Sequence, residues 1–200
     1  MPVTSTFDGV DAVHRVGRYV VRRARPEDAA EYSRVDAELV TTAYAAVMPP
    51  DFAVRQFAEV PEETARRRVE FARNLADERA GVEPERRNWL ALEDDRIVAI
   101  AVSSAQPQSW EDTLAAEPVP GISRQLDHLY LRPSTWGTGL ADALLELALP
   151  GGMPAYLWIV SGNGRAWRFY ERHGFVGDGR EYPCGPQWYF QVLHRMVRPG

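Results

Sequence analysis

The stretch LYLRPSTWGTGLADALLELAL, Leu129–Leu149, joins a strand-like run to a helix through a short loop with Pro133 and two glycines. Its apolar residues predict a strand at 125–131 and, in LADALLELAL, a helix with one apolar stripe. Backbone N–H groups at the start of a helix have no partner within the helix and bind anions well. Gly137 and Gly139 would let a phosphate approach that backbone closely, or they form an ordinary glycine turn.

Two known phosphate-binding patterns do not fit this loop. A dinucleotide fingerprint requires glycine at position 142, where the chain has Asp142, and an acid that pointed inward would repel a diphosphate. The Walker A pattern requires Gly-Lys followed by Ser or Thr, and the chain has no such sequence. A Rossmann site and a P-loop are therefore excluded, while a phosphate cradle and a plain turn both remain open.

The composition of the 200-residue chain is typical of a globular protein with one main core. Its formal net charge of −5, from 23 basic and 28 acidic side chains, argues against nucleic acid as the main partner. The first residues lack the apolar core of a signal peptide, and no apolar run is long enough to cross a membrane. The single cysteine, Cys184, fits a reducing compartment. We therefore expect a cytoplasmic protein without a nucleic-acid or membrane partner.

The order of predicted elements indicates an α/β fold of the α+β kind, with helices packed on a mixed sheet. Strands are predicted at 18–25, in a hairpin at 88–105, and at 125–131, 155–161 and 186–198. Helices are predicted at 26–44, 61–81, 140–149 and 163–174. Residues 1–18 are weakly patterned, so we expect a flexible extension there and a single domain at 19–200. The long polar loop at 106–124 is expected to cover another part of the fold.

A second informative stretch, NGRAWRFYERHG at 163–174, predicts a helix between two boundary signals. Asn163 is a favourable N-cap, and Gly174 is a favourable helix stop. Helical spacing places Asn163 and Tyr170 on one face, opposite several arginines. Amphipathic packing explains most of this pattern. A phenol and an amide on one helix face could also donate a proton and hold a polar chain.

Together, LYLRPSTWGTGLADALL and LWIVSGNGRAWRFYERHGFVGDG resemble the two core motifs of the GNAT N-acetyltransferase superfamily. The second motif, N-x-R-A-x-x-F-Y-E-R-x-G-F, is matched from Asn163 to Phe175. The resemblance is strong at 126–179 and weak before residue 88, and in element order it extends from Tyr19 to Arg198. It implies the GNAT fold, in which a V-shaped cleft for acetyl-CoA splits a mixed central sheet with helices on both faces. It also implies that the glycine loop is a diphosphate cradle.

The resemblance implies roles for individual residues in binding acetyl-CoA, the expected co-substrate. The backbone of Leu129, Tyr130 and Leu131 would pair with the pantetheine arm, and Asn163 would contact that arm. Backbone amides of the loop would hold the diphosphate; they belong to Gly137, Thr138, Gly139, Leu140, Ala141 and Asp142. Tyr170 would protonate the departing thiolate.

The chain departs from the family pattern at two positions. Trp136 stands where members often have Gln or Arg; it would stack on adenine or pack, and we expect it to pack. Many members have a glutamate that helps to deprotonate the amine where this chain has Gln125. Asp127 is two residues further on and shares that strand face, so it is the candidate base. By the same rule, His128 is expected to point the other way.

The resemblance implies an N-acetyltransferase that moves an acetyl group from acetyl-CoA to a primary amine of a small molecule or peptide by direct attack. The alternative is a non-catalytic acyl-CoA-binding sensor or partner-binding module of the same fold. Candidates for the acceptor pocket are Tyr44, Met48, Phe52, Tyr182 and Trp188. The histidines lack metal-ligand spacing, so we expect no metal, and no histidine or acid pattern marks Cys184 as an acetyl carrier. Superfamily members often form homodimers, so a homodimer is possible here.

Overall fold

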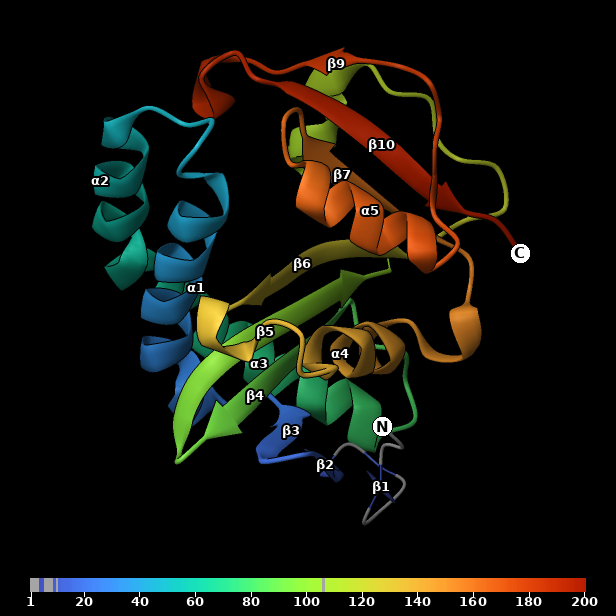
Figure 1. Cartoon of the computed structure of the whole chain (residues 1–200). Helices are drawn as coiled ribbons and strands as arrows, with labels where there is room; N and C mark the ends of the chain where they lie inside the picture. Colours follow the sequence, from blue (N-terminus) through green and yellow to red (C-terminus); the bar gives the residue numbers. More distant parts are fainter. Residues whose placement is uncertain (1–3, 6–8, 10, 106) are drawn as a thin grey trace.

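The computed structural model describes residues 4–5, 9, 11–105 and 107–200 (Figure 1). Its strands are β1 Thr4–Ser5, β2 Val13–Val16, β3 Tyr19–Arg23, β4 Arg86–Glu93, β5 Arg96–Ser104, β6 Gln125–Leu131, β7 Ala155–Val160, β8 Val176–Gly177, β9 Tyr182–Pro183 and β10 Val192–Arg198. Its α-helices are α1 Ala29–Tyr44, α2 Pro50–Ala58, α3 Val60–Arg79, α4 Leu140–Ala148 and α5 Gly164–Arg172. Short 3-10 turns include Ser109–Leu114, Pro133–Thr135 and Pro186–Trp188.

The strands form one mixed sheet in the order β1-β2-β3-β4-β5-β6-β7-β10-β8, and β9 pairs with β10. Among the described residues, neighbouring strands run antiparallel except β6 and β7, which are parallel. The predicted mixed sheet is therefore confirmed, and its parallel contact lies where the cleft is expected.

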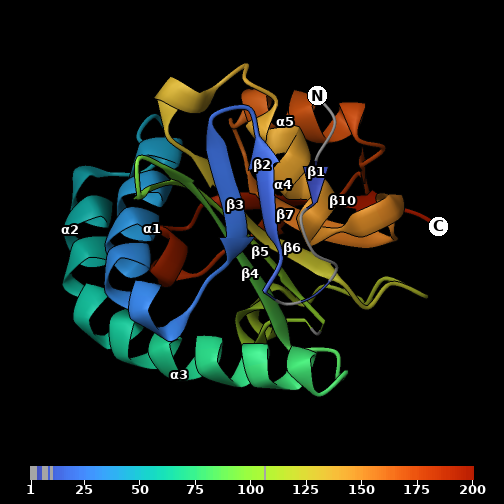
Figure 2. The ribbon, with the colours of Figure 1, turned by 90° about the horizontal axis from the view of Figure 1, so that it is seen from below.

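Helices cover both faces of the sheet, with α1, α2 and α3 on one side and α4 and α5 on the other (Figure 2). On the first face, the rings of Tyr32 and Phe71 meet edge to face, 5.1 Å apart, over Leu90 and Ile100 of the central hairpin. On the second face, Leu144 and its apolar neighbours on α4 share a core cluster with residues of β4 to β7. Burying one such leucine stabilises the fold by about 2 kcal/mol, so the apolar stripe of α4 fixes its orientation.

The sheet begins earlier than the sequence predicts. Val13–Val16 forms β2 and pairs with β3, so that Val16 lies opposite Tyr19, and both side chains are buried. Gly17, at a φ of 60°, makes the tight turn between the two strands. The expected boundary between residues 18 and 19 is therefore wrong. The rest of the expected extension, at 1–3, 6–8 and 10, lies outside the described residues.

Two further elements differ from the sequence prediction. α2 lies between two predicted helices, at 26–44 and 61–81, and was not predicted; Pro50 occupies its first turn, where its missing N–H costs nothing. The last strand begins at Val192 and not at Pro186. Before it, Tyr189 and Phe190 adopt left-handed φ values of 53° and 57°, which interrupt an extended chain.

Candidate active site

β6 and β7 pair only at their first residues. Gln125 lies opposite Tyr156 and Leu126 opposite Leu157, and the described strands form no further pair with each other. The parallel strands therefore separate from residue 127 onward. This separation is the V-shaped split that the resemblance implies.

The backbone of β6 is open along this split. The N–H of Arg132 donates to the carbonyl of Val98 on β5 at 2.9 Å. In an antiparallel pair, hydrogen-bonding residues alternate, so Tyr130 also faces β5 while Leu129 and Leu131 turn their N–H and C=O groups away from it. An edge of unpaired backbone groups thus leads from the split toward the glycine loop.

The glycine loop is shaped by two left-handed residues. Gly137 has a φ of 76° and Gly139, the N-cap of α4, has a φ of 82°. A Cβ at either position would meet no atom within 4 Å, so the backbone here faces open space. The hydroxyl of Thr138 donates to the carbonyl of Thr135 at 2.7 Å and holds the turn. The first N–H groups of α4 lie beyond this turn, as an anion cradle requires.

Asp142, the acid in the first turn of α4, is held by a partner just beyond the end of α5. One of its carboxylate oxygens lies 3.1 Å from Nε2 of His173, which follows the last residue of α5. This contact explains why an acid is compatible with an anion-binding loop: the carboxylate of Asp142 is turned toward His173.

Trp136 lies outside the core and packs against a side chain of α5. Its residue exposure is 48%, and the guanidinium carbon of Arg165 lies 3.2 Å from the centroid of its ring. Trp136 is exposed because it precedes a loop that faces open space. Among the described residues, the one side chain stacked on its ring is Arg165, in the first turn of α5.

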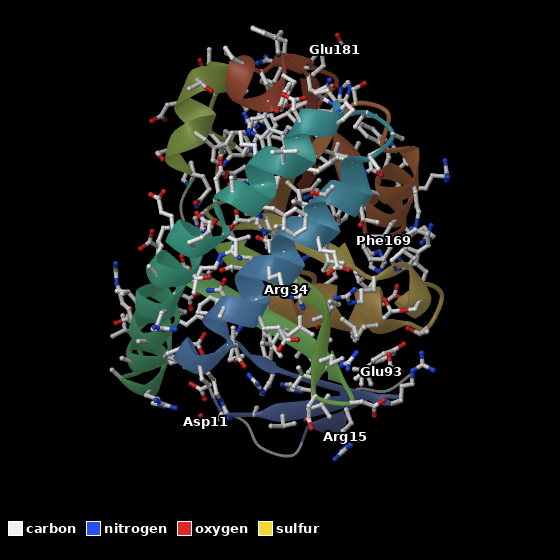
Figure 3. All side chains as sticks on the ribbon, turned by 90° about the vertical axis from the view of Figure 1, so that its left-hand side faces the viewer. Asp11, Arg15, Arg34, Glu93, Phe169 and Glu181 are labelled. Carbon is white, nitrogen blue, oxygen red and sulfur yellow. The ribbon has the colours of Figure 1, made fainter. Side chains whose placement is uncertain are left out.

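α5 carries the other two predicted residues of the cleft. Asn163 caps the helix as predicted, since its Oδ1 accepts the N–H of Ala166 at 3.2 Å. Burial raises the pKa of Tyr170, so its phenol keeps its proton at neutral pH. The ring of Tyr170 contacts the rings of Phe169 and Phe175. Figure 3 shows Phe169 on the side of the molecule where α5 faces α4.

Asp127 and His128 lie on the same face of β6, so the predicted opposition of these two residues is wrong. A bulge in the β5–β6 pairing places His128 opposite Val102 and Leu126 opposite Ser103, and the residue between them has no partner. Such a bulge breaks the alternation of side chains. Asp127 accepts a hydrogen bond from Ser104 at 3.0 Å, and its second oxygen is buried without a partner. Burial raises the pKa of Asp127 to about 6.

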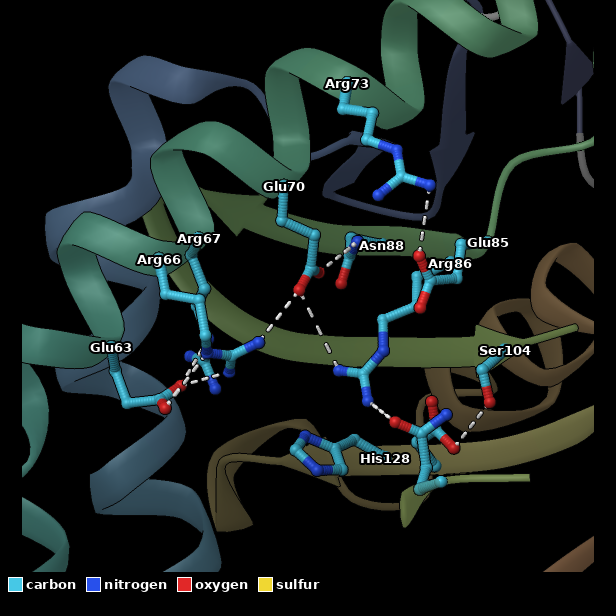
Figure 4. Close-up of polar contacts among 12 residues, drawn as sticks. Glu63, Arg66, Arg67, Glu70, Arg73, Glu85, Arg86, Asn88, Ser104 and His128 are labelled. Carbon is cyan, nitrogen blue, oxygen red and sulfur yellow. Dashed lines mark hydrogen bonds and ion pairs between the residues drawn. The ribbon is translucent and has the colours of Figure 1, made fainter. Parts of the chain in front are cut away.

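Polar side chains form a network on the α3 side of the sheet, in which Glu70 of α3 contacts Arg86 and Asn88 of β4 (Figure 4). His128 Nδ1 lies 3.4 Å from Asp36 on α1, and Arg67 of α3 donates to the other oxygen of Asp36 at 2.5 Å. Although burial opposes it, the charges of His128 and Arg67 hold the pKa of Asp36 well below its usual range. Sequence spacing could not reveal this cluster, because its members come from different elements.

The predicted acceptor residues form one aromatic cluster beside the split. Tyr44 at the end of α1 contacts Phe52 of α2 and Trp188, with ring centroids 6.5 and 6.2 Å apart. Met48 and Tyr182 belong to the same buried cluster, and so does Cys184. Sequence reasoning missed Trp110, Trp158 and Tyr189, which join it. Burial raises the pKa of the Cys184 thiol to about 11, which does not suit a nucleophile.

The described part of the 106–124 loop, residues 107–124, covers β7, as a long polar loop was expected to cover some part of the fold. Glu111 accepts hydrogen bonds from the hydroxyl of Tyr156 at 3.1 Å and from Trp158 Nε1 at 2.8 Å. It also accepts the backbone N–H of Gln108 at 2.7 Å. One buried carboxylate thus fastens the described part of the loop to the strand and brings Trp110 to the aromatic cluster.

A mixed sheet that splits beside a glycine loop and a helix start has the architecture of GNAT acetyltransferases. The model of the acetyltransferase (GNAT) family matches residues 48–175, so the chain belongs to this family. The match includes the glycine loop and α5 through Phe175. A comparison with curated proteins found no match.

Solved structures of the same fold cover nearly the whole chain. PaiA N-acetyltransferase from Thermoplasma acidophilum, in complex with coenzyme A, is 14% identical with a TM-score of 0.60, over 88% of this chain and 97% of that one. A GNAT acetyltransferase from Streptococcus pneumoniae is 19% identical with a TM-score of 0.56, over 90% and 97%. YjaB from Escherichia coli is 17% identical with a TM-score of 0.54, over 91% and 98%. These likenesses show the fold.

Within the described residues, no helix is both long enough and apolar enough to span a membrane.

Proposed function

We propose that the chain transfers an acetyl group from acetyl-CoA to a primary amine of a small molecule or peptide. The observation that carries this proposal is the open backbone edge of β6, which begins where β7 separates and leads to the glycine loop. A pantetheine arm carries amides that can pair with such an edge as an added strand would. The structure of the PaiA relative in complex with coenzyme A supports a coenzyme site in this fold.

The described residues fit such a ligand at both ends of the split. Leu129 and Leu131 offer backbone groups to the pantetheine amides, and Tyr130 lies between them. The amides of Gly137, Gly139 and the first turn of α4 offer N–H groups to the diphosphate, with space left by the two glycines. The N–H of Thr138 instead donates to the carbonyl of Thr135 at 3.4 Å. The side-chain NH2 of Asn163 is left for the arm, because its oxygen already caps α5.

Two side chains would move the protons of the reaction. Acetyl-CoA supplies an activated thioester to an amine that must be neutral to attack. Asp127 takes the proton from the acceptor ammonium, and a pKa of about 6 lets it remain an ionised base at neutral pH. As the new C–N bond forms and the C–S bond breaks, Tyr170 gives its hydroxyl proton to the leaving sulfur, and the proton that the new amide nitrogen loses restores the phenol. Burial favours this role, because it keeps the phenol protonated.

The aromatic cluster is the proposed floor of the acceptor site. Tyr44 contacts the ring of Tyr130 on β6, with hydroxyl oxygens 3.4 Å apart, so the cluster reaches the strand that lines the split. Aromatic faces attract alkylammonium groups and bind apolar chains. We therefore propose acceptors that carry an apolar or aromatic group beside the amine.

The test is release of CoA from acetyl-CoA, followed with a thiol reagent against polyamines, aminoglycosides, amino acids and short peptides. Amine-dependent release that falls in Tyr170→Phe would support the enzyme. An acetyl-CoA-dependent rise in melting temperature without turnover on any amine would favour the non-catalytic acyl-CoA-binding alternative. If the protein showed neither acetyl-CoA binding nor turnover, the acetyltransferase proposal and the acyl-CoA-binding alternative would both be overturned.

A further inference from the structure

The glycine loop has no cationic side chain of its own. From Pro133 to Asp142 there is no lysine or arginine, and the single charged side chain is an acid. Coenzyme A carries a diphosphate and a 3′-phosphate, so its binding calls for cationic groups as well as backbone N–H groups. In this chain a cation must come from another element.

Arg165, in the first turn of α5, lies against the loop. Its guanidinium carbon is 3.2 Å from the ring centroid of Trp136, and Trp136 directly precedes Gly137. A guanidinium over an aromatic face is attracted by the ring electrons. The contact crosses the split, because α5 follows β7 and the loop follows β6.

Stacking leaves the hydrogen-bonding edge of the guanidinium free. The N–H groups of arginine lie in the plane of the group, so a ring beneath that plane occupies none of them. Across the described residues, Arg165 forms no ion pair, whereas other arginines near the cleft do: Arg132 pairs with Glu38, and Arg195 with Asp178. Arg165 is thus held in place without an anionic partner.

We propose that Arg165, stacked on Trp136, is the cationic phosphate anchor of this coenzyme site. This inference rests on the proposed function. Trp136 serves as a platform that orients the guanidinium, and the planar N–H fork binds two oxygens of one phosphate group. The cation that the loop lacks is thereby supplied from α5.

The test is the affinity for CoA measured by titration calorimetry. We expect Arg165→Gln to weaken CoA binding about tenfold, equal to about 1.4 kcal/mol. Trp136→Ala should weaken it similarly, the double variant should be no weaker than either, and Trp136→Phe should stay near the wild type because the ring is kept. Arg68→Gln is the matched control, because it removes an exposed helical arginine on α3. Arg165 and Trp136 lie outside the buried core, so these variants should fold.

Titration with 3′-dephospho-CoA shows whether Arg165 binds the 3′-phosphate or the diphosphate of CoA. If Arg165 binds the 3′-phosphate, Arg165→Gln should not affect the affinity for 3′-dephospho-CoA; if it binds the diphosphate, the tenfold loss should persist. Either result supports the anchor. Binding of CoA to Arg165→Gln as tight as to Arg68→Gln would overturn it and leave the proposed function intact. A wild-type protein that does not bind CoA would overturn both.

Discussion

Asp142 in the first turn of α4 and His173 at the end of α5 form a link of 3.1 Å between the two helices that flank the proposed coenzyme site. The other ring nitrogen of His173 lies 2.9 Å from the carbonyl of Phe169. This contact orients the imidazole, and the ring in turn holds the carboxylate of Asp142 toward the end of α5. A carboxylate held in this way repels a phosphate in the loop less than one that points into the loop.

We expect His173→Gln to weaken CoA binding about threefold to fivefold, a modest loss because the Asp142 side chain is 59% exposed and solvent screens its charge. Asp142→Asn in the same background should restore the affinity, since the freed charge is then absent. Titration calorimetry on the single and double variants measures this coupling. A double variant that binds as weakly as His173→Gln would show that the histidine acts in some other way.

Tyr170→Phe should lower turnover and leave coenzyme affinity unchanged. The phenol is the proposed proton donor, and general acid catalysis is typically worth ~10²–10⁴-fold. Because the ring is kept, its contacts with Phe169 and Phe175 should persist. Pre-steady-state CoA release gives the rate, and calorimetry gives the affinity. Equal rates in the two proteins would assign the proton to another group.

The sequence predicted the site region well because its signals are local. Periodicity and boundary residues placed the strand at 125–131 within the bounds of β6, and they placed α4 and α5 to within about two residues. The cap of Asn163 and the left-handed glycines follow from the same short-range rules.

The features that the sequence did not predict depend on contacts between distant segments. The bulge at Asp127 depends on the register with β5, and strict alternation therefore misplaced His128. The position of Trp136 depends on Arg165, which lies on another element. β2 is too short to show a period, and it forms because β3 offers it an edge. The roles of the predicted site residues stay predictions.

The rate should rise with pH through about 6 if Asp127 is the base, because burial raises the pKa of its carboxyl to that value and only the ionised form accepts a proton. Asp127→Asn should lower kcat/KM about 100-fold and abolish the rise of kcat/KM with pH near 6. The profile of kcat/KM between pH 5 and 8, measured on both proteins, is the test. If the rise of kcat/KM with pH persisted in Asp127→Asn, the titrating group would be one other than Asp127.

The same carboxyl should make stability depend on pH. Its pKa is raised from 3.8 to about 6 on folding, so the folded state holds the proton more tightly than the unfolded state does. The stability is present in full below pH 4 and is lost as the pH rises through 6, by about 3 kcal/mol. Asp127→Asn should therefore unfold at higher urea concentration than the wild type at pH 8, and at the same concentration near pH 4. The exposed Asp112→Asn, measured alongside, should show no such difference.

Glu111→Ala should destabilise the fold by about 2–4 kcal/mol, because it leaves the buried hydroxyl of Tyr156 and the partly buried Nε1 of Trp158 without their acceptor. The loop would lose its attachment to β7, and Trp110 its fixed place against Trp158. We therefore expect a change in tryptophan fluorescence and faster proteolysis within 106–124, together with a lower urea midpoint. Asp112→Ala is the matched control, because it truncates the next acid on the same turn, whose side chain is exposed. Equal midpoints for the two variants would mean that the loop is held by its apolar contacts and not by this carboxylate.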